Sequence, residues 1–144
     1  MKYTLSNTID KPLKEVMEKF NDPEGVKHWM EGLNRTEPVS GTPGKVGAVT
    51  DFYFLHKNKE MKITETILEE NLPEQIKFSY QSPMGSNEVE MRFEELSNNS
   101  VKQTNNTSFE LQGAMRVMGF FIKGMFKKQS LKYMNAFKQY VEQS

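Results

Sequence analysis

Four polar side chains fall on strand faces that are otherwise apolar, and their chemistry could orient a ligand or move a proton. Successive side chains of a strand point to opposite faces, so every second residue shares a face. On that alternation the inward-facing polar residues are Glu65, Gln103, Asn105 and Thr107. A buried polar group without a partner costs on the order of 1–3 kcal/mol, so a set of four requires an explanation. Either they satisfy one another and ordered water, or they line a cavity and orient a ligand.

Glu65 is the weak candidate for catalysis in this set. If its carboxyl group faces inward, desolvation raises its pKa and makes it a general acid or base beside Tyr80 or Gln103. The alternative is a slip of one residue in strand register, which turns Glu65 toward solvent. Bulges and edge strands also tolerate polar faces, so the amide and hydroxyl residues fit a partly exposed strand as well.

Other catalytic and metal-binding arrangements are not indicated. His28 and His56 belong to distant elements, and no ligand spacing connects them. The chain has no cysteine, which removes disulfides, thiolate nucleophiles and cysteine metal sites. The Glu69–Glu70 pair is typical of solvated turn charges. The glycine-containing segment SGTPGKVGA lacks the phosphate-binding pattern, so we expect neither a metal nor a cofactor.

The charge balance bounds the partners. Acidic and basic residues number 19 each, so no overall field attracts nucleic acid or anionic lipid. Aromatic residues do not interleave with a basic stripe on the strands, which also argues against nucleic acid. The amino terminus has no apolar run of signal-peptide length, so we expect a cytoplasmic protein.

The elements that must position these residues follow from periodicity and turn signals. The length of 144 residues fits one domain, 1–144. A short strand precedes two short helices, each introduced by an acidic residue and a proline that suit a cap and a first turn (Asp10 with Pro12, Asp22 with Pro23). After the loop at 40–47, closely spaced strands with polar turns predict an antiparallel meander. The expected helices are Leu13 to Phe20 and Glu24 to Met30, and the expected meander strands are 48–55, 60–67, 75–80, 88–96 and 101–111.

A long terminal helix must cover the apolar face of that sheet, which gives an α+β fold. Its expected core stripe is Leu131, Met134, Phe137 and Val141, with Tyr133 and Tyr140 at the flanks.

Three segments carry a resemblance to a known family. They are VKHWMEGL, which contains Trp29, the loop SGTPGKVGA and the terminal LKYMNAFKQYVE. Together with the order of elements, they resemble the START-like superfamily, also called SRPBCC, and most closely its polyketide cyclase/dehydrase and lipid-transport branch. The resemblance implies a helix-grip fold, in which a curved antiparallel sheet wraps around the C-terminal helix and encloses a hydrophobic cavity. The two short helices would close one end of that cavity.

The resemblance implies a function but no catalytic residues, because the superfamily shares none. We expect binding, with transport as its extension, of a hydrophobic or amphipathic small molecule or lipid in that cavity. One alternative is a cyclase or dehydratase that acts on a polyketide-like substrate with Glu65, and another is an interaction module like the activators of a chaperone ATPase. The oligomeric state stays open. The expected ligand-binding residues are Trp29, Phe52, Phe54, Met61, Ile63, Glu65, Phe78, Tyr80, Met91, Phe93, Gln103, Asn105, Thr107, Phe109, Met118, Phe121, Ile122 and Met125.

The apolar first half of the terminal segment has two interpretations. It is too short to span a bilayer, since Arg116 and Lys123 bracket a run far below the roughly 20 residues required. In the first interpretation, the glycine-interrupted segment is a gate at the cavity mouth that moves as a ligand enters and touches a lipid surface transiently. In the second, it is an irregular helix start packed on the core, with solvated lysines.

Overall fold

The computed structural model describes residues 1–143 and contains one seven-stranded antiparallel sheet. The strand order is β1-β7-β6-β5-β4-β3-β2, so the first strand pairs with the last. The strands are β1 (Lys2–Ile9), β2 (Leu33–Ser40), β3 (Val49–His56), β4 (Lys59–Asn71), β5 (Gln75–Ser82), β6 (Gly85–Ser97) and β7 (Ser100–Leu111). The helices are α1 (Leu13–Phe20), α2 (Val26–Trp29), the short 3₁₀ helix η1 (Gly113–Met118) and α3 (Gly119–Glu142).

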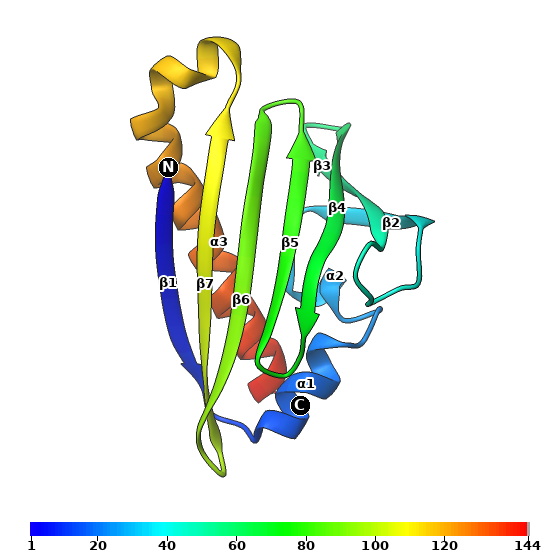
Figure 1. The fold of residues 1–144 in the computed structure, drawn as a ribbon, viewed down its shortest axis with the longest axis vertical. Helices are drawn as coiled ribbons and strands as arrows, with labels where there is room; N and C mark the ends of the chain where they lie inside the picture. The colour runs from blue at the N-terminus through cyan, green and yellow to red at the C-terminus, as the bar shows by residue number, and fades with distance from the viewer. Residues whose placement is uncertain (144) are drawn as a thin grey trace.

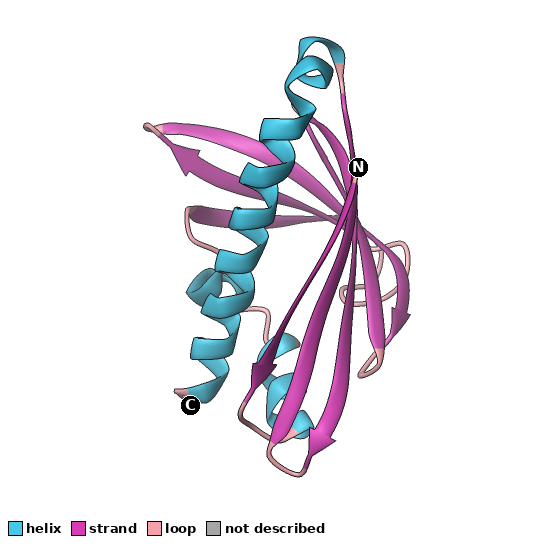
Figure 2. Ribbon diagram, turned by 90° about the vertical axis from the view of Figure 1, so that its left-hand side faces the viewer, coloured by secondary structure: helices cyan, strands magenta, loops and turns pink. Residues whose placement is uncertain are grey.

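The sheet is strongly curved, and α3 runs along its concave side (Figures 1 and 2). α1 and α2 follow the first strand and lie near the C-terminal end of α3 (Figure 1). This arrangement confirms the helix-grip fold that the sequence predicts. Within residues 1–143, no helix combines the length and the apolar content needed to cross a bilayer.

The strands extend beyond their predicted limits where polar turn residues continue the ladder. β6 begins at Gly85, and β4 continues to Asn71 through an irregularity in register after Ile67. The β3–β4 hairpin turns through Lys57 and Asn58, which both have positive φ angles. Two such residues in a two-residue loop match the right-handed twist of the flanking strands.

An aromatic cluster joins α3 to the sheet in the C-terminal half of the helix. The Phe137 ring lies 5.3 Å from Trp29 of α2 and 5.9 Å from Phe20 of α1, between ring centroids. Phe93 of β6 packs against Phe20 at 5.2 Å and against Phe137 at 6.5 Å. These contacts fix the end of the sheet near α1 as a closed core.

Two helix predictions are wrong in their details. Asp10 does not cap α1, because Pro12 occupies the cap position and no side chain bonds there. The second helix is limited to Val26–Trp29, since residues 22–25 form a turn in which the Glu24 amide donates to Asp22 Oδ1 at 3.0 Å. Pro12 carries no side-chain oxygen that could accept from the free amides of the first turn of α1.

The predicted core stripe of α3 is correct at three of its four positions. Met134, Phe137 and Val141 are buried, whereas Leu131 is 40% exposed. Successive helical residues are separated by 100°, so Leu131 lies well away from the direction of Phe137. The side of α3 toward the sheet is instead continued by Tyr133 and Ser130, which are both partly buried.

Candidate functional site

β7 presents its polar row to the interior of the molecule. Gln103, Asn105 and Thr107 are only 4–6% exposed, and they alternate with residues that are more exposed. The predicted orientation of this strand is therefore correct. Gln103 is satisfied, because its Nε2 donates to Asn7 Oδ1 at 2.9 Å and to the Met134 carbonyl oxygen at 3.4 Å.

Two acceptor atoms in the same row have no hydrogen-bond partner within residues 1–143: Asn105 Oδ1 and Thr107 Oγ1. Their cross-strand neighbours explain this. Asn105 is paired with Met91 of β6 and Leu5 of β1, which are apolar. Thr107 is paired with Val89 and with Tyr3, whose hydroxyl group bonds to α3 instead. The row therefore contains two buried polar atoms whose hydrogen-bonding capacity the described residues leave unused.

Glu65 also faces the concave side, so the alternative of a slipped register is wrong. It lies directly opposite Tyr80 in the β4–β5 ladder, and the Tyr80 hydroxyl group donates to Glu65 Oε2 at 2.8 Å. Burial raises the pKa of Glu65 to about 7, although the bond from Tyr80 acts in the opposite direction. Burial, and then the charge of Glu65, raises the pKa of Tyr80 well above its usual value, so Tyr80 remains a donor.

The Glu65–Tyr80 pair is approached from the helix by Tyr133. Tyr133 adds to the rise in the Tyr80 pKa, and both side chains pack against the same core cluster. Burial raises the pKa of Tyr133 itself, so it stays a neutral phenol near pH 7. The sequence placed Tyr133 only at the flank of the helix.

The side chains around this pair are not completely buried. Phe54, Met61, Ile63, Glu65 and Tyr80 are partly buried, in contrast to the closed aromatic cluster near α1. A surface with apolar sides, one titratable carboxyl group and one phenol donor can bind the polar end of an amphipathic molecule. They can also exchange a proton with it, since the carboxyl pKa lies near neutrality.

Seven of the other expected ligand-binding residues separate into three groups. Three lie in the main core or on the adjoining concave face: Phe52, Phe78 and Met91. Two belong to the closed aromatic region around Phe137: Trp29 and Phe93. Two form a second buried cluster with Tyr3 between β1, β7 and α3: Phe109 and Ile122.

Three expected pocket residues lie on the surface instead. Met118, Phe121 and Met125 are 53%, 76% and 53% exposed. The prediction that they bound the mouth of a cavity stays a prediction, and η1 and the first turns of α3 extend beyond the sheet (Figures 1 and 2). Ile122, which belongs to the same segment, is buried.

Two residues beside the Glu65–Tyr80 pair were missed. Asn87 is paired with Tyr80, and Thr50 is paired with Glu65, and both are partly buried. Alternation along β6 would have placed Asn87 on the inward face, because it lies two residues before Val89.

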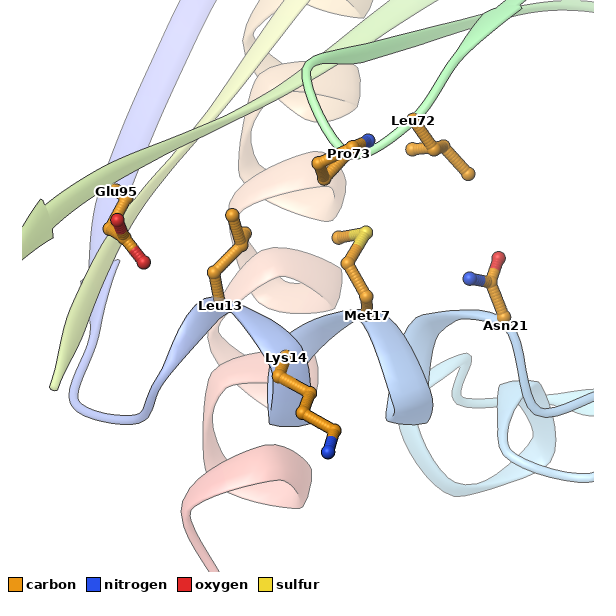
Figure 3. A pocket seen from close by; sticks show the side chains of 7 residues that line it. All are labelled: Leu13, Lys14, Met17, Asn21, Leu72, Pro73 and Glu95. Atoms are coloured by element: carbon orange, nitrogen blue, oxygen red, sulfur yellow. The ribbon is translucent and has the colours of Figure 1, made fainter. Parts of the chain in front are cut away.

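A cleft of about 440 Å³ lies away from these polar residues, between α1 and the β4–β5 turn (Figure 3). Leu13 and Met17 of α1 face Leu72 and Pro73 across it, as Figure 3 shows. A second cleft, of about 400 Å³, lies along β4 and β5 and includes Met61. Neither cleft includes the buried acceptors of β7, and both are open to solvent, so neither is the enclosed cavity that the resemblance implies.

Metal binding has no support in the part of the chain that the structure describes. In residues 1–143, no group of three or more histidine, aspartate or glutamate side chains is arranged to hold an ion.

Comparisons with known proteins agree with this geometry. The model of the family described as polyketide cyclase/dehydrase and lipid transport matches residues 1–142. No curated protein matches the chain.

Solved structures share the fold at low sequence identity. A Streptomyces sp. R1128 protein, the ZhuI aromatase/cyclase, aligns with a TM-score of 0.83 at 14% identity, over 99% of this chain and 93% of that one. The protein Ara h 8.0201 aligns with a TM-score of 0.80 at 14% identity, over 100% and 99% of the two chains. A conserved protein from Geobacillus kaustophilus aligns with a TM-score of 0.82 at 12% identity, over 100% and 97%. The chain therefore belongs to the polyketide cyclase/dehydrase and lipid-transport family, within the START-like superfamily.

Proposed function

We propose that the protein binds a hydrophobic or amphipathic small molecule on the concave face of the sheet, beside α3. The observation that carries this proposal is the pair of buried acceptors, Asn105 Oδ1 and Thr107 Oγ1, which the chain itself leaves without partners. Each costs on the order of 1–3 kcal/mol in the free protein, and a ligand donor would recover that cost. Family membership supports the proposal, since lipid transport is part of the family's description.

The chemistry of the face defines the ligand class. Asn105 Oδ1 requires a hydroxyl or N–H group on the ligand, whereas the Thr107 hydroxyl group can either accept or donate. The partly exposed apolar side chains of β3 and β4, Phe54, Met61 and Ile63, would supply most of the affinity through burial of apolar area. Glu65 would accept a donor when it is ionised and would donate when it is protonated, so it suits a ligand hydroxyl or carbonyl group.

Ligand capture tests this function directly. Native mass spectrometry of protein purified from its host should show a mass above that of the chain, which organic extraction removes. The same measurement on the double variant N105L/T107V should show at least a tenfold lower occupancy, because both acceptors are gone. T104V, a change on the opposite face of the same strand, serves as the matched control and should retain full occupancy. Equal occupancy in all three proteins would contradict a role for the β7 acceptors.

A second candidate is a cyclase or dehydratase that acts on a polyketide-like substrate at the same place. The observation in its favour is a carboxyl group with a pKa of about 7, held by the Tyr80 hydroxyl group at 2.8 Å. Such a group can donate or remove a proton at neutral pH and accelerate a reaction by about 10²- to 10⁴-fold. The aromatase/cyclase named among the structural neighbours supports this class of substrate.

Turnover separates the two candidates. An enzyme should convert at least one member of a panel of polyketide-like substrates, and E65Q should abolish conversion while retaining substrate binding. Absence of conversion across the panel, combined with a co-purifying ligand, would leave the binding protein as the correct function.

A further inference from the structure

The charge of the chain is distributed unevenly along its length. Although the whole sequence is neutral, residues 111–141 contain no acidic side chain. The basic residues of that segment are Arg116, Lys123, Lys127, Lys128, Lys132 and Lys138. The rest of the chain therefore carries an excess of acidic residues, and the segment from η1 through α3 is basic.

Most of these cations near the start of α3 are not neutralised by the fold. Lys132 pairs with Glu31, and Lys138 pairs with Glu142 at 2.6 Å. Within residues 1–143, no acidic side chain forms an ion pair with the four basic residues nearer the start of α3: Arg116, Lys123, Lys127 and Lys128.

The same end of the molecule exposes large apolar side chains. Val117 is 90% exposed, Phe120 is 83% exposed and Phe121 is 76% exposed, and Met118 and Met125 are each 53% exposed. Figures 1 and 2 show η1 and the start of α3 as the far end of the molecule, beyond the sheet. We call these five side chains the apolar tip. Apolar side chains gathered in this way, beside basic residues, mark a surface that contacts a partner.

The spacing between the apolar tip and the lysines is regular. Lys127 follows Phe120 by seven residues, and Lys128 follows Phe121 by seven. Seven residues make almost two helical turns, so each lysine lies on the same side of α3 as its phenylalanine and about 10 Å farther along the axis. Basic residues therefore form a collar behind the apolar tip, and interfacial segments that combine apolar and basic side chains bury their apolar face about 5–10 Å into the boundary between headgroups and acyl chains.

The tip is held to the body of the protein. The Tyr3 hydroxyl group of β1 lies 2.6 Å from Ser130 Oγ and donates to the Phe126 carbonyl oxygen at 3.2 Å. Ile122 packs against Tyr3 and Phe109 in a buried cluster. The apolar side chains are consequently exposed on an ordered helix and are not packed against the core, so the interpretation of this segment as an irregular core helix is wrong for them.

We infer that the apolar tip and its basic collar bind the surface of an anionic lipid bilayer. The phenylalanines enter the boundary between headgroups and acyl chains, and the lysines contact lipid phosphates. A second copy of the chain fits this surface poorly, because a symmetric contact would bring two basic collars together without acidic partners. The inference goes beyond the proposed function, because lipid adsorption does not require an occupied ligand site.

Vesicle sedimentation tests the inference. The full chain at low ionic strength should sediment with vesicles of phosphatidylcholine that contain about one quarter phosphatidylglycerol, and at least tenfold less with phosphatidylcholine alone. High salt should weaken the binding by screening the collar. F120S/F121S should lose binding at least tenfold, and K127Q/K128Q should lose about as much, since each lysine near the surface contributes roughly fivefold.

Matched controls separate this surface from the ligand site and from misfolding. V39S and L55S change side chains on β2 and β3 that are 57% and 47% exposed, and both should sediment like the unmodified protein. N105L/T107V should also sediment normally, so a failure of the ligand proposal leaves this test intact. Thermal unfolding should confirm that F120S/F121S remains folded.

Two results would overturn the inference. One is equal sedimentation of the unmodified protein and F120S/F121S. The other is a dimer in native mass spectrometry that F120S/F121S converts to a monomer, without vesicle binding by either protein, which would assign the tip to a second copy.

Discussion

The Tyr80 hydroxyl group donates a hydrogen bond to Glu65 Oε2 at 2.8 Å, across two adjacent strands and on the face that α3 covers. A carboxyl group in this position is held where the neutral form is favoured, because burial penalises its charge. The stability of the fold and the chemistry of the site are therefore linked through one proton.

The protonation of Glu65 determines how the free energy of unfolding should change with pH. The pKa of Glu65 is about 7 in the folded protein against an ordinary value of 4.5, so the folded state binds more protons between these values. The free energy of unfolding should thus fall by about 2–3 kcal/mol as the pH rises from 4.5 to 7. The side chain introduced by E65Q cannot ionise, so the free energy of unfolding of this variant should not fall in this way. At pH 8 it should exceed the free energy of unfolding of the unmodified protein.

Chemical denaturation across this pH range measures the difference between the two proteins. E18Q, which changes an exposed residue of α1, is the control and should follow the unmodified protein at every pH. A constant difference between E65Q and the unmodified protein from pH 4.5 to pH 8 would contradict the assignment.

Removal of the Thr107 hydroxyl group should stabilise the fold and weaken ligand binding. The hydroxyl oxygen is buried without a partner, so T107V, which keeps the shape of the side chain, should raise the free energy of unfolding by about 1 kcal/mol. The same change should weaken the binding of a ligand that donates to this oxygen. Thermal unfolding and ligand titration measure the two effects, and T104V should change neither. Destabilisation by T107V would indicate that the hydroxyl group already has a partner, such as an ordered water molecule.

Alternation along the strands was sufficient to orient β7 and Glu65, because one buried face imposes one register. The ends of the strands were harder to predict, since polar residues such as Asn87 extend a ladder without the apolar alternation that marks a strand. At the start of α3 the sequence left two interpretations open. Met118 and Phe121 follow the composition of a core helix, but the sheet ends before it reaches them, and only the three-dimensional extent of the sheet reveals that they are exposed.

The Tyr3 hydroxyl group should stabilise the N-terminal half of α3 locally. Y3F removes the contacts with Ser130 Oγ and the Phe126 carbonyl oxygen, and it should destabilise the fold by about 1 kcal/mol. Because these contacts lie near the N-terminal half of α3, hydrogen exchange should accelerate at residues 119–130 more than at residues 133–142. Y53F removes a longer bond of 3.3 Å between exposed side chains and should change neither region. Uniform acceleration along α3 in Y3F would show that the helix opens as one unit.

Phe137 should contribute strongly to the stability of the aromatic cluster near α1. Its side chain is 1% exposed and contacts the rings of Trp29, Phe20 and Phe93, so F137A should lower the free energy of unfolding by about 3–5 kcal/mol through lost burial and a residual cavity. Trp29 is the only tryptophan, and its ring centroid lies 5.3 Å from that of Phe137, so its fluorescence reports both the unfolding transition and the altered packing. F120A deletes the same ring from a side chain that is 83% exposed and should change the free energy of unfolding by less than about 0.5 kcal/mol. Similar losses in the two variants would mean that the start of α3 packs against the body of the protein in solution, and they would also contradict an apolar tip that is free to bind lipid.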